Sequence, residues 1–408
     1  MNGTIYMPVG EVCSSISDTY REKKNMVTLI NTSDVLEGRV LNHERVPNSN
    51  LKGQFKKTFQ RDDILYSEIR PQNRRFAYVD FSPIDYIAST KLMVIRAKKD
   101  VVSPKYLYYF LKNSSTVAEL QLLAETRSGT FPQITFSEVA NLTIPVPSLA
   151  VQEVIVQTMQ CLEDKITCNE QINDNLEQQA QAIFKEWFIE NPENNEWSTG
   201  TFAELIKTTL NGDWGKEAPT GNSTEKVYCI RGADIPEVKA GNKGKMPTRY
   251  ILPKNFVKKQ LTAGDIVVEI SGGSPTQSTG RCTAITQSLL DRYDSGMVCT
   301  NFCKAIKPKE GYSLFIYYYW QYLYGKGIFF SYENGTTGIK NLDFSGFIET
   351  ETILIPPVDK VIAFDDYCKS IFNQIFANGK QNEHLAVLRD TLLPKLMSGE
   401  LDVSDIDL

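Results

Sequence analysis

Side chains that could support acid–base or nucleophilic catalysis are sparse in this sequence. It contains two histidines, His43 and His384, and neither has neighbours along the chain that resemble a catalytic triad. The glycines of residues 273–281 lack the GxxxxGK spacing of a phosphate-binding loop, which disfavours ATP binding. Residues 355–358 lack the leading Asn or Asp and the aromatic residue of an amino-methyltransferase motif. The sequence therefore predicts a protein that binds a partner rather than one that catalyses a reaction.

Two stretches carry polar and basic side chains suited to the edges of DNA bases. Arg can contact guanine through two hydrogen bonds in the major groove, and Gln or Asn can contact adenine in the same way. The candidates in the first stretch are Arg70, Gln72, Asn73, Arg74 and Arg75. The candidates in the second stretch are Ser274, Thr276, Gln277, Ser278 and Arg281. Which of them reach a base depends on the fold.

Positive charge is concentrated within or beside these stretches. Residues 52–75 hold seven Lys or Arg against three acids, and residues 239–259 hold seven Lys or Arg and no acid. Residues 153–190, by contrast, hold eight acids and two lysines. We predict that the paired lysines of the two basic stretches contact phosphates; these are Lys56, Lys57, Lys258 and Lys259. The alternative is that each charge run is a solvated face, but its occurrence at a corresponding place in both halves favours phosphate binding.

Two glycine-containing segments, residues 127–130 and residues 334–340, are further candidates. Glycine lets the backbone approach a phosphate closely, because it has no side chain in the way. The charged candidates in these segments are Arg127 and Lys340. An ordinary turn explains either segment equally well.

Two long helices are predicted to position these stretches. Apolar residues spaced by four and then three positions form a heptad seam over residues 155–187, and moving on by 209 positions reveals a second seam over residues 364–396. Both seams carry two asparagines in the same two places, which are Asn169, Asn173, Asn378 and Asn382. The repetition indicates one design used twice.

The two seams predict an antiparallel coiled-coil pair with a pseudo-twofold axis. In that arrangement Asn169 and Asn173 face Asn378 and Asn382, where buried asparagines cost stability but penalise wrong registers. A helix over residues 155–187 spans about 48 Å at 1.5 Å per residue, so the pair could set the distance between two globules. The alternative is two unrelated amphipathic helices, each packed on its own globule.

A globule precedes each helix, and the second repeats the first. Both contain short runs of β-forming residues separated by Pro, Asn and Gly turns, and a helix is expected over residues 104–123. Collinear matches link the globules, such as residues 55–57 with 257–259 and Asp63 with Asp265. The predicted fold class is α/β (α+β), with two globules joined by two long antiparallel helices. The predicted organisation is globule 1–147, helix 148–192, globule 193–357, helix 358–400 and acidic tail 401–408.

The composition is that of a soluble multidomain protein. The 408 residues are 41% hydrophobic and 23% charged, and no run of about 18 apolar residues could span a membrane. The eight cysteines lack the paired spacing of a zinc site, so we expect free thiols and no bound metal. The first ten residues lack the layout of a signal peptide, which predicts a cytoplasmic protein.

The order of these elements resembles the specificity (S) subunit of type I restriction-modification systems. The resemblance covers essentially the whole chain. It is carried by residues 129–134 (GTFPQI) leading to residues 144–147 (IPVP), by residues 176–188, and most specifically by residues 388–400 (LRDTLLPKLMSGE). The globules would then be target recognition domains, which vary with the DNA sequence that they read.

The resemblance implies a non-catalytic subunit that recognises a two-part DNA site. Its partners would be double-stranded DNA, two copies of an adenine-specific methyltransferase subunit and the restriction subunits. S-adenosylmethionine, ATP and Mg²⁺ would be bound by those partners and not by this chain. Three alternatives stay open: a recognition subunit whose single partner carries both methylation and cleavage, an enzyme that acts alone on DNA, and a protein-binding scaffold.

Overall fold

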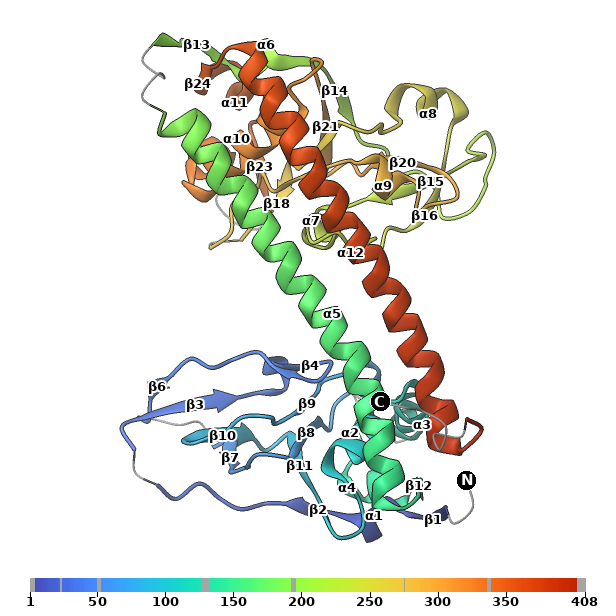
Figure 1. Cartoon of the computed structure of the whole chain (residues 1–408). Helices are drawn as coiled ribbons and strands as arrows, with labels where there is room; N and C mark the ends of the chain where they lie inside the picture. Colours follow the sequence, from blue (N-terminus) through green and yellow to red (C-terminus); the bar gives the residue numbers. More distant parts are fainter. Residues whose placement is uncertain are drawn as a thin grey trace. The chain divides into compact units, whose positions relative to one another are not determined.

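The computed structural model describes residues 4–22, 24–49, 53–126, 132–191, 196–274, 276–335 and 339–401 (Figure 1). The chain divides into two compact units. Unit 1 consists of Met1–Asp164 and Leu385–Leu408, and unit 2 consists of Lys165–His384. Each unit contains one globule and a part of each of two long helices.

Unit 1 contains two four-stranded sheets. The first is antiparallel, in the order β2-β11-β8-β9, and its strands are β2 (Cys13–Ile16), β8 (Ile64–Ser67), β9 (Phe76–Tyr78) and β11 (Leu92–Ala97). The second has the order β6-β3-β10-β7 with a parallel β3–β10 pair, and its strands are β3 (Met26–Ile30), β6 (Val46–Pro47), β7 (Phe55–Lys57) and β10 (Tyr86–Ser89). Successive side chains of a strand point to opposite faces, so Ile64 joins one apolar core and Leu65 the other.

The helices and short strands of unit 1 cover the first sheet. They are α1 (Val9–Val12), α2 (Pro104–Lys112), α3 (Ser114–Glu125), α4 (Phe136–Asn141), the pair β1 (Ile5–Pro8) with β12 (Thr143–Val146), and the hairpin β4 (Val35–Leu36) with β5 (Arg39–Val40). The single helix predicted for residues 104–123 is wrong. Asn113 takes an extended ψ of 138° and its side chain accepts a hydrogen bond from the Ser115 amide, so it ends α2 and caps α3.

Unit 2 repeats this topology. Its antiparallel sheet has the matching order β14-β21-β17-β19, with strands β14 (Ile206–Asn211), β17 (Ile266–Glu269), β19 (Cys282–Ala284) and β21 (Cys303–Pro308). The second sheet again contains a parallel pair, with strands β15 (Glu225–Ile230), β16 (Thr248–Ile251) and β20 (Gly296–Cys299). The pair β13 (Ser198–Thr201) with β24 (Thr352–Ile355) matches β1 with β12. The internal repeat is therefore confirmed for these strands, although the second sheet has four strands in unit 1 and three in unit 2.

The remaining elements of unit 2 include the features that differ from unit 1. They are α6 (Phe202–Leu205), α7 (Ile235–Lys239), α8 (Pro253–Lys259), α9 (Gln287–Leu290), α10 (Ser313–Gly325), α11 (Phe344–Thr350) and the small sheet of β18 (Ser271–Gly272), β22 (Glu333–Asn334) and β23 (Lys340–Leu342). The match of residues 55–57 with residues 257–259 does not extend to secondary structure. The first segment is strand β7 and the second ends helix α8, which begins at Pro253, a favoured first residue of a helix.

An ion pair between a buried carboxylate and a partly exposed cation is repeated at the start of a central strand of each unit. In unit 1 the fully buried Asp63 accepts hydrogen bonds from Nε and Nη2 of Arg96, both 2.7 Å long. In unit 2 the buried Asp265 accepts one of 2.7 Å from Nζ of Lys307. Each carboxylate also accepts from a backbone amide three residues earlier, at 2.8 Å in both units. The predicted match of Asp63 with Asp265 therefore marks the same structural device in both repeats.

The long helices are α5 (Leu149–Phe184), which continues as a π-helical turn (Lys185–Ile189), and α12 (Val358–Ser398). Ser148 caps α5, because its hydroxyl accepts a hydrogen bond from the Val151 amide at 3.4 Å. Helix α12 continues past Pro394. Within unit 2 the two helices run antiparallel, and the rings of Trp187 and Phe364 lie 6.2 Å apart.

The four seam asparagines lie together in unit 2 and are all buried. Asn169 donates to Oδ1 of Asn382, and Asn378 donates to Oδ1 of Asn173, both at 2.8 Å. Asn173 also donates, at 3.1 Å, to the carbonyls of Ala240 and Ile375. These are contacts across the helix pair, as the sequence predicts, and they also tie α5 to the turn after α7. That they set the register stays a prediction.

Leucine substitutions should show that the two asparagine pairs contribute unequally to the free energy of unfolding. Asn173→Leu removes three hydrogen bonds and leaves two carbonyls without this donor, so we expect a loss of about 2–3 kcal/mol in the free energy of unfolding. Asn382→Leu should cost only about 1 kcal/mol, because Asn169 keeps its 2.8 Å bond to Gln381. Urea unfolding of both variants measures the difference. Equal losses would contradict the unequal roles proposed for the two pairs.

Candidate nucleic-acid interface

The two sets of predicted base-reading residues occupy the same place in the two repeats. We call residues 68–75, between β8 and β9, polar loop 1, and residues 270–281, between β17 and β19, polar loop 2. Each lies beside the segment that follows the glycine-containing loop predicted from the sequence: Ile69 bridges to Gln133 in unit 1, and Ser271 pairs with Asn341 in unit 2. In unit 2 the structure thus brings together two segments that the sequence singled out separately, since Gly272 pairs with Lys340.

Polar loop 1 has an unusual backbone. Arg70 and Arg74 have φ values of 46° and 52°, the left-handed region that side chains rarely adopt, and they flank a 3-10 turn (Pro71–Asn73). The Arg70 amide donates to the carbonyl of Pro132 at 3.1 Å, and the Gln72 amide donates to Oε1 of Gln121 at 3.1 Å. These bonds hold the turn so that the side chains of Gln72 and Asn73 are exposed.

Two arginines of polar loop 1 contact the protein itself. Nη2 of Arg74 donates to Oγ of Ser114 at 2.9 Å, and Nη1 of Arg75 donates to the carbonyl of Ser33 at 2.9 Å. Both side chains are partly buried. They therefore brace the loop, and their availability to DNA depends on the hydrogen-bonding capacity that each guanidinium retains.

Polar loop 2 is organised by side-chain hydrogen bonds. Oγ of Ser274 accepts from the Gln277 amide at 3.1 Å, which leaves the side chains of Thr276 and Gln277 exposed. Arg281 instead donates from Nε and Nη2 to the two carboxylate oxygens of the buried Glu269, at 2.8 and 2.7 Å. These hydrogen bonds raise the pKa of Arg281. Thr276 and Gln277 are thus presented outward, while Arg281 anchors the loop.

In both units the first lysine of the pair is exposed and the second donates hydrogen bonds to the protein itself. Lys56 and Lys258 are exposed. Nζ of Lys57 donates to the carbonyls of Thr90 and Leu92, at 3.1 and 2.8 Å, and burial lowers the pKa of this lysine.

The second lysine of the other pair is also held internally. Nζ of Lys259 donates to the carbonyl of Gly212 at 2.8 Å.

The charged candidates of the glycine-containing segments are Lys340 and Arg127. Nζ of Lys340 donates to Oε2 of Glu333 at 2.7 Å. Arg127 lies outside the residues that the structure describes. The candidates whose side chains are exposed are therefore Lys56, Arg70, Gln72, Asn73, Lys258, Thr276 and Gln277.

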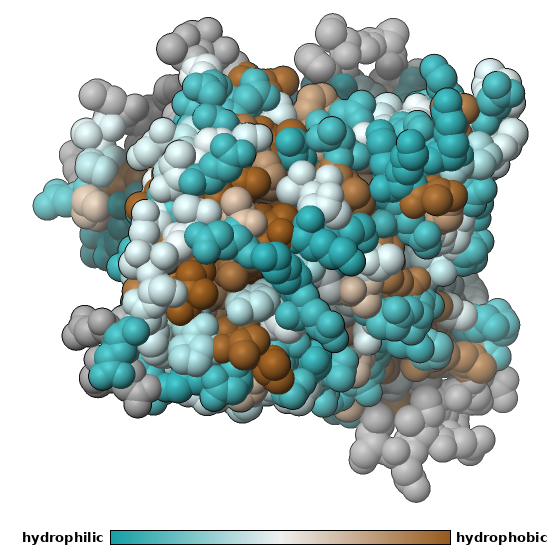
Figure 2. Space-filling view, turned by 90° about the horizontal axis from the view of Figure 1, so that it is seen from above, coloured by the Kyte–Doolittle hydropathy of each residue, from teal (hydrophilic) through white to brown (hydrophobic). Residues whose placement is uncertain are grey.

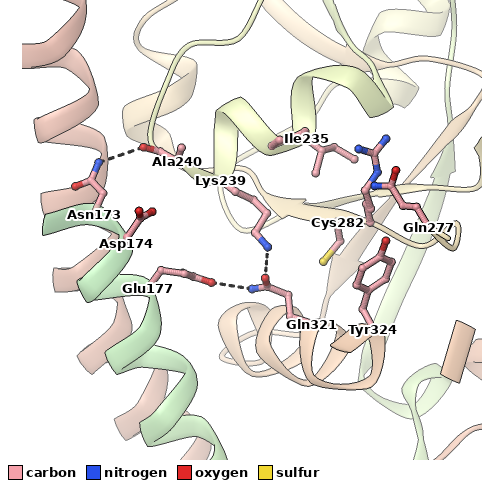
Figure 3. A pocket seen from close by; sticks show the side chains of 12 residues that line it. Asn173, Asp174, Glu177, Ile235, Lys239, Ala240, Gln277, Cys282, Gln321 and Tyr324 are labelled. Atoms are coloured by element: carbon pink, nitrogen blue, oxygen red, sulfur yellow. Dashed lines mark hydrogen bonds between the residues drawn. The ribbon is translucent and has the colours of Figure 1, made fainter. Parts of the chain in front are cut away.

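A cavity of about 390 Å³ in unit 2 connects polar loop 2 to helix α5 (Figure 3). Gln277 and Arg281 line it from the loop, and Asp174 and Glu177 line it from the helix. Across the cavity, Gln321 of α10 donates to Oε1 of Glu177 at 3.2 Å and accepts a hydrogen bond from Lys239 of α7. Hydrogen bonds therefore join the long helix α5 to α10 and, through Gln321, to α7.

Sequence reasoning missed the residues at the turn that follows β10 and β20. In unit 1 this is Lys91, whose Nζ lies 3.4 Å from both Oε2 of Glu68 and Oε1 of Gln133. In unit 2 it is Phe302, whose side chain is 59% exposed. The two positions correspond only through the strand pairing, because Lys91 directly precedes Leu92, the partner of Ser67, and Phe302 directly precedes Cys303, the partner of Glu269.

Other kinds of site are not indicated by the described residues. No group of three His, Cys, Asp or Glu lies close enough to hold a metal ion in those parts of the chain. All eight cysteines are free, and burial raises the pKa of Cys282 to about 12, so its thiol is unreactive at neutral pH. Among the described helices, none is both long and apolar enough to cross a membrane.

Comparison with known proteins gives consistent similarities. The family model described as "Type I restriction modification DNA specificity domain" matches residues 6–178. The HindI specificity subunit of Haemophilus influenzae is 30% identical over 440 aligned positions, covering 92% of this chain and 94% of that protein. The MjaIX specificity subunit of Methanocaldococcus jannaschii is 28% identical, covering 80% and 77%. The S subunit of a type I system from M. genitalium shares the fold, with a TM-score of 0.52, 15% identity and coverage of 98% and 97%.

Proposed function

The chain belongs to the family of DNA specificity subunits of type I restriction-modification systems, and from this premise we propose that polar loops 1 and 2 each read one half of a two-part DNA site. Members of this family recognise DNA and leave the catalysis to other subunits. One observation supports the proposal most strongly. Two loops with outward-facing polar side chains occur at the same place in two copies of one fold.

The partners follow from the symmetry of the repeat. Two similar units in one chain can recruit two copies of one protein in equivalent ways. We propose that these are two adenine-specific methyltransferase subunits, joined by the restriction subunits in the cytoplasm. S-adenosylmethionine, ATP and Mg²⁺ would be bound by these partners. Helices α5 and α12 would set the gap between the half-sites and provide the surface on which the partners dock.

Mapping of methylated bases tests the two-part site. The chain is produced together with its methyltransferase partner in a strain that lacks other methyltransferases, and modified adenines are located by sequencing. We expect a motif of two short defined segments separated by a gap of unspecified bases. A continuous, undivided motif would contradict the proposal. Absence of any affinity for duplex DNA at low salt, with the partner present, would instead favour a protein-binding scaffold.

Charge reversal of the exposed lysines tests phosphate contact. We expect Lys56→Glu and Lys258→Glu each to weaken duplex binding about tenfold and to lower the slope of log K against log salt by about 1. Filter binding across a salt series measures both quantities. Lys165→Glu, an exposed position on the acidic part of α5, is the matched control and should leave the slope unchanged. Unchanged slopes in the first two variants would remove those lysines from the interface.

A further inference from the structure

Unit 2 has an apolar groove that the proposed function does not use. Its volume is about 520 Å³, and three large apolar side chains line it: Trp214, Phe302 and Ile339. They are 37%, 59% and 65% exposed. Figure 2 shows hydrophobic side chains reaching one face of the molecule as patches among hydrophilic ones. A single exposed apolar residue needs no explanation, but three that share one groove indicate a binding surface.

The backbone of Phe302 and the ring of Trp214 are held in place before anything binds. The carbonyl of Phe302 accepts hydrogen bonds from the amides of Ile270 and Ser271, at 2.9 and 3.2 Å. The guanidinium carbon of Arg249 lies 3.9 Å from the ring centroid of Trp214. Only 9% of the surface of Arg249 is exposed. This contact covers one face of the indole and leaves its exposed surface at the groove.

The groove is continuous with polar loop 2. Ser271 and Gly272 line it and lead directly to Thr276 and Gln277, the exposed polar side chains of the loop. On its other side, Ile339 immediately precedes strand β23, which pairs with Ser271 and Gly272. When a DNA duplex contacts polar loop 2, the base pairs next to those at the loop would therefore lie at the groove.

The equivalent place in unit 1 is charged. The Glu68 amide donates to the carbonyl of Lys91 at 3.0 Å, just as the Ile270 amide donates to the carbonyl of Phe302. Lys91 and Phe302 thus occupy the same position in the two repeats, one with an ammonium group and the other with a phenyl ring. Because the backbone makes the same hydrogen bond in both repeats, the two positions differ only in what their side chains can contact.

We propose that the groove formed by Trp214, Phe302 and Ile339 receives the apolar surface of a base in the second half-site. This inference rests on the proposed function. The apolar surface has two possible sources, the 5-methyl group of a stacked thymine and the face of an unstacked base, and both suit aromatic side chains. Polar loop 2 supplies the hydrogen bonds, and Phe302 adds an aromatic contact at the position where unit 1 has Lys91.

The experiment uses the full chain with its methyltransferase partner and a duplex carrying the mapped site. One duplex series replaces each thymine of the second half-site with uracil, which removes only the methyl group. Another places fluorescent 2-aminopurine at single positions of that half-site. We expect Phe302→Ala to weaken specific binding about tenfold while leaving the salt slope unchanged. Val257→Ala, which truncates an 81% exposed side chain of unit 2 that does not line the groove, is the matched control and should bind normally.

The outcomes distinguish a thymine methyl group from an unstacked base. They also distinguish a DNA contact at the groove from a protein contact. A loss of affinity with uracil that disappears in Phe302→Ala supports the methyl group as the contact. A rise in 2-aminopurine fluorescence on binding that disappears in Phe302→Ala supports an unstacked base. Unchanged specific binding by Phe302→Ala overturns the inference but leaves the proposed function intact. Weaker binding of Phe302→Ala to the methyltransferase partner without DNA also overturns it, because the groove would then be a protein contact.

Discussion

Replacing Gly379 with alanine is expected to lower the free energy of unfolding by about 3 kcal/mol, the scale of overpacking in a tightly packed interior. A Cβ at this position of α12 would overlap the carbonyl group of Gly241, in the turn after α7. The position of the Cβ is fixed by the backbone of α12 and the carbonyl belongs to the backbone of Gly241, so no side-chain rotation relieves the overlap. The gain of about 1 kcal/mol that alanine brings over glycine inside a helix is too small to compensate.

The measurement is urea unfolding of the full chain, with hydrogen exchange to locate the effect. Faster exchange should be confined to unit 2, around residues 235–242, because Asn173 and Arg292 donate to the carbonyls of Ala240 and Gly241 in this turn. Gly325→Ala, at the end of α10, is the matched control, since an added Cβ there meets nothing within 4 Å. An equal or higher stability of Gly379→Ala would show that the turn does not pack against the helix this closely.

Replacing Arg96 with methionine should cost about 3 kcal/mol of unfolding free energy, the lower end of the effect of removing one partner from a buried ion pair, because Asp63 is fully buried while Arg96 is 30% exposed. The Asp63 carboxylate is fully buried and would keep only its bond from the Gln60 amide. Burial of an uncompensated charge is what makes the change expensive, and loss of the two hydrogen bonds adds to it. Urea unfolding combined with hydrogen exchange in unit 1 would measure the loss.

An exposed ion pair in the same unit provides the comparison. Lys99→Met removes the 2.7 Å ion pair with Asp62, in which the lysine side chain is 61% exposed and the aspartate side chain 30% exposed. This should lower the free energy of unfolding by less than about 1 kcal/mol. The double variant Asp63→Leu with Arg96→Met should recover most of the loss, because it leaves no buried charge. Equal losses for Arg96→Met and Lys99→Met would contradict the argument from burial.

The long helices and the internal repeat could be predicted because they are periodic. Burial on one side of a helix requires an apolar residue about every 3.5 positions, and that spacing can be read directly from the chain. The seam also indicated which four asparagines would meet. The helix over residues 104–123 was predicted incorrectly because the composition is helical throughout, while the backbone turn at Asn113 serves the packing of two separate helices.

The candidate interface could be predicted as two corresponding stretches but not as individual contacts. Lys56 and Lys57 are identical in type and adjacent in sequence, yet Lys56 is exposed and Lys57 binds carbonyls more than thirty residues away. Arg281 and Gln277 differ in the same way, since Glu269 holds the arginine. Long-range partners decide which side chains remain available.

The sequence by itself determined the family, the repeat and the seam, because each depends on residue type and spacing along the chain. Only the tertiary structure decided which polar groups are already paired, and that Trp214, Phe302 and Ile339 line one groove. These three residues come from distant segments and share no spacing. Their association depends on how the strands pair, which brings the turn after β20 beside the end of β17 through the hydrogen bonds to the carbonyl of Phe302.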